Sequence, residues 1–185
     1  MRFTRESILV GGLVTTALLL GSYVVQLFPA PEDILREPFR RVATVGSPID
    51  LRTGTLTVRS ITKTQHMVKF QQKMSTKGAF IIVEYLFRPH RESTPPSTLI
   101  ARDSKGRRFE GSPSTNGCAY TLPGITSLCS LSVEVAADAT GITLEIPAHL
   151  QAPGDDLAVY DTDRMTEEDS VEVEESRAAT EDELR

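Results

Sequence analysis

An uncharged apolar run at residues 8–27 constrains this chain more than any other feature. Its sequence is ILVGGLVTTALLLGSYVVQL, which is 20 residues without a charged side chain. A helix that rises ~1.5 Å per residue needs about 20 residues to cross a hydrocarbon core of ~30 Å. We therefore expect residues 8–28 to form a transmembrane signal anchor, with residues 1–7 as a short cytoplasmic N-terminus. Such a span places the rest of the chain beside a membrane.

The charges around this run predict its direction. Arg2 and Arg5 lie directly before it, whereas residues 28–33 directly after it are uncharged or acidic. Arginines at residues 36–41 leave a simple charge count indecisive, but the residues next to the span favour a cytoplasmic N-terminus. The predicted location is thus the cell membrane, with the C-terminal domain extracytoplasmic. A cleaved signal peptide is the alternative, although no small-x-small cleavage site follows the apolar core.

The net charge of −5 conceals two oppositely charged parts. Residues 155–185 carry 13 Asp and Glu against three Arg, a net charge of −10, and residues 1–154 carry a net charge of +5. Because residues 161–185 contain few large apolar side chains, we predict a disordered acidic tail. This tail either solubilises the protein or tethers a basic surface, on a partner or on the domain itself.

Residues 42–160 have the pattern of an all-β domain. Leu56 and Val58 alternate with polar residues, and the alternation shifts at residues 59–60, which indicates a β-bulge. Similar alternation marks strands in residues 130–135 and 142–146, and further strands are expected at 79–87, 98–102, 107–110 and 157–160. Gly106 suits the turn between the strands at 98–102 and 107–110. We predict an immunoglobulin-like antiparallel β-sandwich of about seven strands, preceded by a proline-containing linker at residues 29–41.

The strand at residues 79–87 is apolar on both faces. One face carries Phe80, Ile82 and Leu86, so something is expected to cover it. The cover is either a loop or edge of the domain itself, or a partner, which makes these three residues a candidate partner surface.

Cys118 and Cys129 are the two cysteines of the chain. Paired, they close a loop of about a dozen residues, and an even cysteine count in an exported domain favours a disulfide. Two free buried thiols are the alternative, which would indicate a reducing compartment and the opposite topology.

Residues that carry chemistry are sparse. His66, His90 and His149 are not spaced as metal ligands, and neither a nucleophile elbow nor a phosphate-binding glycine loop is present. We therefore expect no catalytic, metal or cofactor site, no enzyme activity and no nucleic-acid partner. The residues from 62 to 77 are predicted to be an exposed connection and contribute to a candidate basic patch, which consists of Lys63, Lys69, Lys73, Lys77, Arg107 and Arg108.

The order of these features resembles a known family. The segments that carry the resemblance are GTLTVRSI at residues 54–61, KGAFIIVEYLF at 77–87, LIARDSKGRRFE at 99–110 and SLSVEVAADATGITLEI at 130–146. Together with LPG at residues 122–124, they resemble the telokin-like family of small bacterial extracytoplasmic domains of unknown function. The resemblance implies an immunoglobulin-like sandwich behind a signal peptide or membrane anchor.

Two functions fit these expectations. The first is a membrane-anchored, non-catalytic accessory or assembly subunit of a larger membrane or envelope complex, which contacts a protein partner. The second is an extracytoplasmic binding module for a small molecule, lipid or cell-wall polymer, using the basic patch to attract an anionic ligand.

Overall fold

The computed structural model describes residues 14, 16–23, 38–69, 71–91, 94–111, 118, 122–148, 155–173 and 176–184. The chain divides into two units, Met1–Glu37 and Pro38–Arg185. In the first unit, residues 14 and 16–23 are helical. Among the described residues, no helix has both the length and the apolar character that a membrane crossing requires. Much of the run at 8–27, on which the predicted signal anchor depends, lies outside the described residues.

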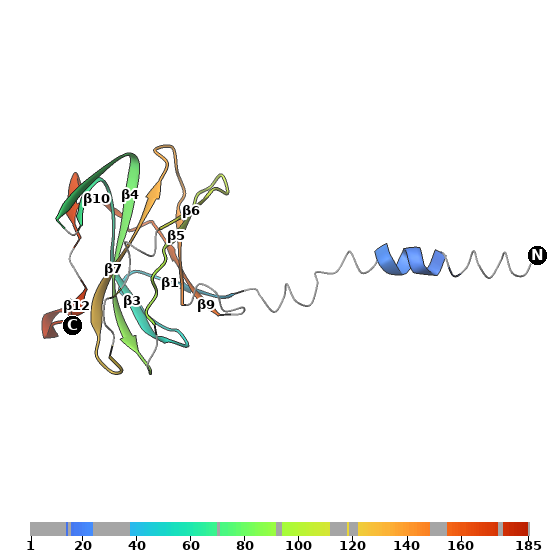
Figure 1. Cartoon of the computed structure of the whole chain (residues 1–185), viewed down its shortest axis with the longest axis horizontal. Helices are drawn as coiled ribbons and strands as arrows, with labels where there is room; N and C mark the ends of the chain where they lie inside the picture. Colours follow the sequence, from blue (N-terminus) through green and yellow to red (C-terminus); the bar gives the residue numbers. More distant parts are fainter. Residues whose placement is uncertain are drawn as a thin grey trace, which may run out of the picture. The chain divides into compact units, whose positions relative to one another are not determined.

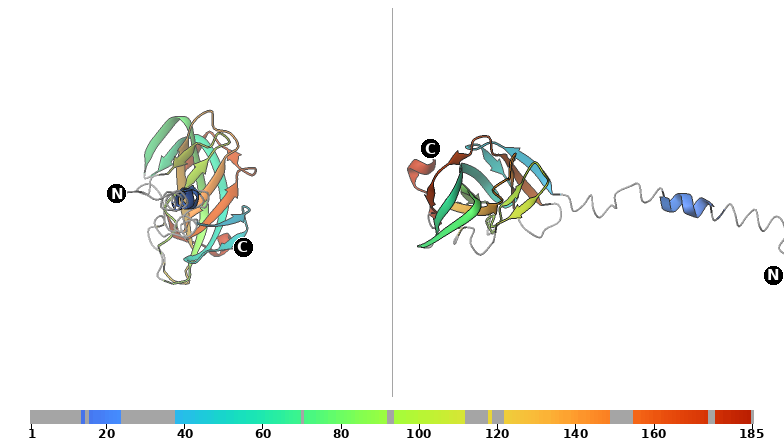
Figure 2. Two further views of the ribbon diagram at one scale, coloured as in Figure 1. Left: turned by 90° about the vertical axis from the view of Figure 1, so that its right-hand side faces the viewer. Right: turned by 90° about the horizontal axis from the view of Figure 1, so that it is seen from above.

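The second unit is a β-sandwich of two sheets (Figures 1 and 2). The smaller sheet has the order β1 (Phe39–Ala43), β9 (Asp156–Asp161), β8 (Thr143–Pro147), β5 (Ile100–Arg102) and β6 (Arg108–Glu110). The larger sheet has the order β10 (Thr166–Glu167), β3 (Gly54–Lys69), β4 (Gln72–Pro89), β7 (Ser127–Val135) and β12 (Arg177–Ala178). Two further strands, β2 (Pro48–Asp50) and β11 (Ser170–Glu172), also pair with β3.

The strand order follows a known arrangement. Strands β3, β4 and β7 are neighbours in one sheet, and β5, β8 and β9 are neighbours in the other. In an immunoglobulin sandwich, one sheet has strands A, B and E as neighbours, and the other has C, F and G. Strands β3, β4 and β7 match the first set in order, and β5, β8 and β9 match the second. The added feature is β1, which pairs in parallel with β9 at the edge of the smaller sheet.

The core lies between the two sheets and explains why the central strands form. Ile81, Val83 and Tyr85 of β4 alternate onto one face and pack in one cluster with Leu144 and Ile146 of β8. These five side chains are almost completely buried. The predicted bulge is confirmed, because the register between β3 and β4 shifts between residues 58 and 60.

The structure corrects the prediction of an exposed connection at residues 62–77. Strand β3 continues to Lys69 and β4 begins at Gln72, so these residues form the end of a long hairpin. Threonine is β-branched and fits a pleated surface, and Thr62 and Thr64 are buried in β3. The turn includes Gln71 at a φ of 62°, in the left-handed region.

The structure also corrects both ends of the predicted domain. The sandwich begins at Phe39 with β1, within the range assigned to the linker. The prediction of a disordered tail is wrong for residues 161–173 and 176–184, which contain β10, β11, β12 and the 3-10 helix η2 (Glu181–Leu184). The physical reason is that the edges of β3 and β7 offer backbone partners that the tail does not possess alone.

Candidate interaction surface on the larger sheet

The outward face of β4 carries a second, smaller apolar cluster, which we call the outer cluster. It consists of Met67, Phe80, Ile82 and Val173, with the partly buried Met74 and Val171 packed against it. Alternation along β4 sends Phe80 and Ile82 away from the main core, and they are 8% and 2% exposed. Two of the six side chains belong to the acidic tail, residues 161–185, so the chain itself covers this face.

The tail follows the free edge of β3. Strands β10 and β11 pair with it in parallel, with Glu167 opposite Lys63 and Val171 opposite Met67. The backbone N–H of Glu168 donates to the Lys63 carbonyl at 3.0 Å. The N–H of Val173 likewise donates to the Val68 carbonyl at 2.9 Å. The tail therefore adds a strand to the sheet and also places a side chain in the outer cluster.

An ion pair accompanies this pairing. Lys63 Nζ donates to Glu167 Oε1 at 2.7 Å, and this hydrogen bond and the lysine charge lower the pKa of Glu167. The two side chains are 35% and 71% exposed, so solvent screens the pair and its contribution to stability is small. The ion pair joins the same two residues that the backbone register of β10 on β3 sets opposite each other.

The end of the tail returns to the opposite edge of the sheet at β12. The N–H of Ala179 donates to the Thr126 carbonyl at 2.9 Å, and β12 pairs antiparallel with the start of β7.

An ionic contact closes the end of the tail. Arg177 donates to both carboxylate oxygens of Glu183, at 2.8 and 2.7 Å. The hydrogen bond from Arg177, and then the backbone N–H of Thr180, lower the pKa of Glu183 to about 2. We call Arg177, Thr180 and Glu183 the tail clasp.

The predicted partner surface is thus divided. Phe80 and Ile82 are buried in the outer cluster beneath the tail, whereas Leu86 lies farther along β4, half-buried, between Thr57 and Leu128. Of the two covers that the sequence left open, the structure shows one supplied by the domain's own chain. A role for these residues in binding a partner stays a prediction.

The predicted basic patch is spread over two hairpins. Its lysines lie on β3 and β4, whereas Arg107 and Arg108 lie at the β5–β6 turn and on β6. Arg108 pairs with Glu110 at 2.7 Å. Lys69 is buried, and this burial lowers the pKa of its ammonium group, whereas Lys73 and Lys77 are exposed.

Arg107 belongs to a compact ionic cluster. Its Nε donates to Asp103 at 2.7 Å and its Nη1 donates to Asp138 at 2.9 Å, while Lys105 donates to Asp138 at 2.6 Å. Hydrogen bonds from Lys105 and then Arg107 lower the pKa of Asp138 to about 2. Burial alone would raise the pKa of Asp103, but the hydrogen bonds and charge of Arg107 outweigh it and lower that pKa. This cluster fixes the predicted turn, in which Gly106 has a φ of 77°.

Two hollows adjoin the lysines. A cavity of about 430 Å³ lies where the tail meets the β3–β4 hairpin, and Lys63, His66, Gly78, Glu167 and Asp169 are among its lining residues. An open groove of about 790 Å³ is lined by Lys77, Phe109, Glu110 and Glu134, among others, so one end of the sandwich brings β4 and β6 together. Within the described residues, no group of three His, Cys, Asp or Glu side chains is arranged to hold a metal ion.

The histidines have ordinary surface partners. His66 Nδ1 lies 2.9 Å from Ser75 Oγ, and His90 Nε2 lies 3.0 Å from Asp50 Oδ1. His149 lies outside the described residues.

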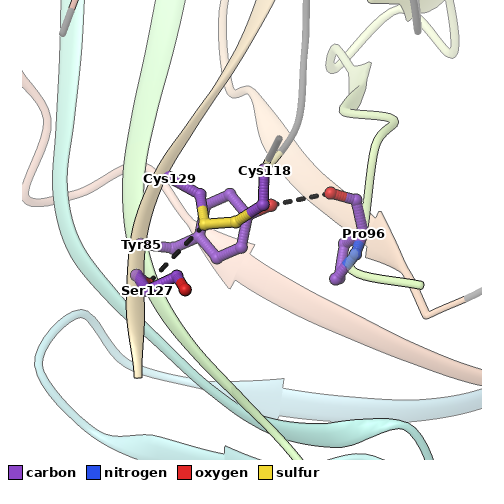
Figure 3. The surroundings of a disulfide bond; sticks show 5 residues. All are labelled: Tyr85, Pro96, Cys118, Ser127 and Cys129. Atoms are coloured by element: carbon purple, nitrogen blue, oxygen red, sulfur yellow. Dashed lines mark hydrogen bonds between the residues drawn. A yellow bond between two sulfur atoms is a disulfide. The ribbon is translucent and has the colours of Figure 1, made fainter. Parts of the chain in front are cut away.

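The predicted disulfide is confirmed. Cys118 and Cys129 are bonded, with their Cα atoms 5.2 Å apart, and Cys129 is buried on β7 (Figure 3). Beside them, the Tyr85 hydroxyl donates to the Pro96 carbonyl at 2.7 Å. Complete burial raises the pKa of Tyr85. The bond therefore ties the loop that precedes β7 to the middle of the main core.

The first strand is fastened to the sandwich by two buried carboxylates. Arg40 of β1 donates to Glu145 at 2.7 Å, and Arg102 of β5 donates to the other oxygen of Glu145 at 3.0 Å. Arg41 donates to Asp156 at 3.0 Å. Glu145 and Asp156 are 3% and 1% exposed. We call these contacts the β1 clamp.

The tail side chains and the β1 clamp were not predicted from the sequence. A signal for the tail was present, because residues 170–174, SVEVE, alternate valine with polar residues as strands do. The high density of negative charge around them hid this alternation. Nothing comparable marked the clamp, because Arg40 and Glu145 are 105 residues apart in sequence.

Comparisons with known proteins find similarity among solved structures. No family model matches the chain, and no curated protein matches it. A β-sandwich protein from Clostridium difficile 630, described as uncharacterized, is 14% identical with a TM-score of 0.47, over 68% of this chain and 95% of that one. The secreted protein MPT63 from Mycobacterium tuberculosis is 14% identical with a TM-score of 0.48, over 68% and 99%. The yjhA protein from Bacillus subtilis is 15% identical with a TM-score of 0.40, over 64% and 98%. The telokin-like resemblance stays a prediction, and the description of this chain as a β-sandwich rests on its own two sheets.

Proposed function

We propose that this protein is a membrane-anchored, non-catalytic accessory or assembly subunit of a larger membrane or envelope complex. In this proposal residues 8–28 span the membrane once, and an immunoglobulin-like sandwich of the telokin-like kind contacts a protein partner on the extracytoplasmic side. The uncharged run of 20 residues supports the anchor, and the disulfide supports an oxidising compartment.

One observation carries the protein-binding part of the proposal. The sandwich holds an extended protein segment on its surface, because the tail pairs with the β3 edge and places Val173 against Phe80 and Ile82. Addition of a strand to a sheet edge is a general mode by which domains bind other proteins. An assembly subunit needs a surface that can bind a segment of another protein, and this domain already binds such a segment of its own chain.

The β1 clamp supports the anchoring part. Strand β1 starts directly after residue 38, and Arg40 and Arg41 bind buried carboxylates within two residues of its start. The sandwich therefore begins firmly at the point where the N-terminal segment ends, which suits a domain that is held at a membrane.

The alternative is a binding module for an anionic small molecule, lipid or cell-wall polymer. The exposed Lys73 and Lys77 of β4 would attract such a ligand. This alternative predicts that the midpoint temperature of thermal unfolding rises when a polyanion is added.

The decisive experiment is purification of the tagged full chain from its native membrane in mild detergent, with co-purifying proteins identified and counted by mass spectrometry. The proposal predicts one or two membrane proteins at a fixed ratio to the tagged chain. A variant whose residues 8–28 are replaced by an unrelated span is the matched control for contacts made by the anchor. Recovery of the tagged chain alone would contradict the proposal.

A further inference from the structure

We propose that the β3 edge and the outer cluster form a groove for an extended acidic segment of a partner protein, and that the tail is a tethered occupant which this segment displaces. The inference rests on the proposed function and specifies the chemistry of the partner. We call the groove, formed by residues 62–68 of β3 together with Met74, Phe80 and Ile82, the acceptor groove.

The tail shows which sequence the acceptor groove accommodates. Thr166 pairs with Thr62 and Ser170 pairs with His66, an offset of 104 in both cases (166 − 62 and 170 − 66), so β10 and β11 keep the same register on β3 on either side of residues 168–169. A carboxylate then meets Lys63, and two valines spaced by two residues, at positions 171 and 173, enter the outer cluster. A partner segment needs the same features in the same parallel direction.

The docking of the tail has the signs of low local stability. Thr166, Glu167, Ser170 and Glu172 are all exposed, and among the described residues of β10, β11 and position 173 only Val173 is fully buried. Segments with few buried apolar contacts and exposed backbone hydrogen bonds open far more often than a core does. The tail valines belong to the outer cluster, whereas Met165, just before β10, packs against the main core. Release of residues 166–173 alone therefore leaves the packing of the main core in place.

The groove side also suits exchange between occupants. Met67 and Met74 frame the position of the tail valines, and methionine side chains adapt their shape to different partners. Lys63 on β3 and the exposed Lys73, which lies opposite Val68, give this end of the hairpin a positive charge. Acidic segments are favoured for that reason, and the tail itself carries 11 of the 25 Asp and Glu residues of the chain.

Covalent linkage makes the tail a strong competitor. A tethered segment acts at an effective concentration in the millimolar range, so a free segment of equal quality binds poorly until the tail is released. The proposal thus predicts a domain that is closed when alone and gains affinity for the partner segment when the tail is weakened.

The test uses the full chain, solubilised in detergent, and a fluorescently labelled peptide with the sequence of residues 164–184 as the probe. Val173→Asp places a charge in the outer cluster and releases the tail, and Val42→Asp is the matched control on an exposed position, 82% accessible on β1. We expect V173D to bind the peptide at least about tenfold more tightly than the unaltered chain, by fluorescence anisotropy, because self-competition is removed. V42D should bind like the unaltered chain, and a peptide with aspartate at both valine positions should bind neither protein.

Equal peptide binding by V173D and V42D would overturn the proposal. Binding of the aspartate peptide as tight as that of the original peptide would overturn it too.

Hydrogen exchange on the unaltered chain tests the proposal without any variant. The N–H of Val173 should exchange at least about tenfold faster than the β4 amides that face β7, through local opening. Exchange as slow as in β4 would show a permanently fixed tail and would overturn the proposal even if V173D failed to fold.

These outcomes are separable from the test of the proposed function. If the membrane purification recovers no partner while V173D binds the peptide, the acceptor groove stands and the accessory-subunit proposal falls. If partners are recovered in unchanged amounts by V173D, while neither protein binds the peptide, the subunit proposal stands and the acceptor groove falls.

Discussion

Glu145 shows how single residues hold the outward face of the smaller sheet. It lies on β8 with its carboxylate 3% exposed, between Arg40 of β1 and Arg102 of β5. A buried carboxylate without such partners is costly, whereas here each oxygen accepts a hydrogen bond from an arginine. Because the two arginines come from different strands, the charge of Glu145 joins β1 to the body of the sheet.

We expect Glu145→Gln to lower the free energy of unfolding by ~2 kcal/mol, because the amide NH2 that replaces one carboxylate oxygen cannot accept from an arginine, and the other hydrogen bond loses its anionic acceptor. Urea unfolding followed by circular dichroism measures this loss. Glu110→Gln is the control, since Glu110 forms an exposed pair with Arg108 and should cost under ~0.5 kcal/mol. Equal losses in the two variants would show that the β1 clamp does not stabilise the fold.

The second prediction at this scale concerns Cys118 and Cys129. Replacing both by serine reopens a loop of about a dozen residues and should lower the free energy of unfolding by ~3 kcal/mol. The measurement is urea unfolding with and without reductant. Reductant should destabilise the unaltered chain by a similar amount and leave the serine variant unchanged; a response of the serine variant would contradict the assignment.

At the scale of elements, the tail clasp makes the end of the chain sensitive to acid. The folded-state pKa of Glu183, about 2, lies below the ordinary value of 4.5. A carboxylate with a depressed pKa contributes stability above its ordinary pKa and loses that contribution as the pH falls through the folded value. The clasp should therefore hold at neutral pH and open between about pH 4.5 and pH 2.

NMR titration of the Glu183 carboxyl group tests this assignment. We expect Arg177→Gln to move the pKa of Glu183 up toward its ordinary value, because the largest cause of the shift is removed. Arg164→Gln removes an exposed arginine elsewhere in the tail and should leave the titration unchanged. A Glu183 pKa that R177Q does not move would show that the clasp is absent in solution.

Prediction at the element scale succeeded where the side-chain period was unambiguous. The apolar segment at 79–87 lies within β4, and the alternating segments at 130–135 and 142–146 lie largely within β7 and β8; the bulge beside Val58 followed from a single shift in the alternation. Prediction failed where composition outweighed period. Residues 62–77 are polar and basic, which hid a hairpin whose strands pair with each other. The tail strands depend on contacts such as Glu167 with Lys63, which are distant in sequence and cannot be read from the tail alone.

The candidate interaction surface was predicted in part for the same reason. The second apolar face with Phe80 and Ile82 was visible in the sequence, because a strand that is apolar on both sides needs two covers. Its cover, Val173, lies more than ninety residues away within a segment whose charge indicates disorder. The basic patch stays a prediction, and the sequence did not show that one of its cations, Arg107, is engaged by Asp103 and Asp138.

At the scale of the whole molecule, the location predicted from residues 8–28 is open to a direct test. Leu19→Arg places a charge near the middle of the run, where insertion into a membrane costs ~3 kcal/mol. We expect the unaltered chain to sediment with membranes and to require detergent for release, and L19R to shift toward the soluble fraction. Leu184→Arg, at an exposed position of the tail, is the control and should stay with the membranes. Sedimentation of all three alike, or of none, would contradict the predicted anchor.

The parallel pairing of β1 with β9 has a mechanical consequence. Five consecutive residue pairs join the two strands, from Phe39 with Asp156 to Ala43 with Tyr160. A pull along the axis of β1 from its N-terminal end strains the evenly spaced hydrogen bonds of all five pairs together, instead of opening them one after another. The sandwich therefore resists shear at β1, where the chain enters it. Force spectroscopy should find the greatest rupture force when the pull is applied along β1 from its N-terminal end.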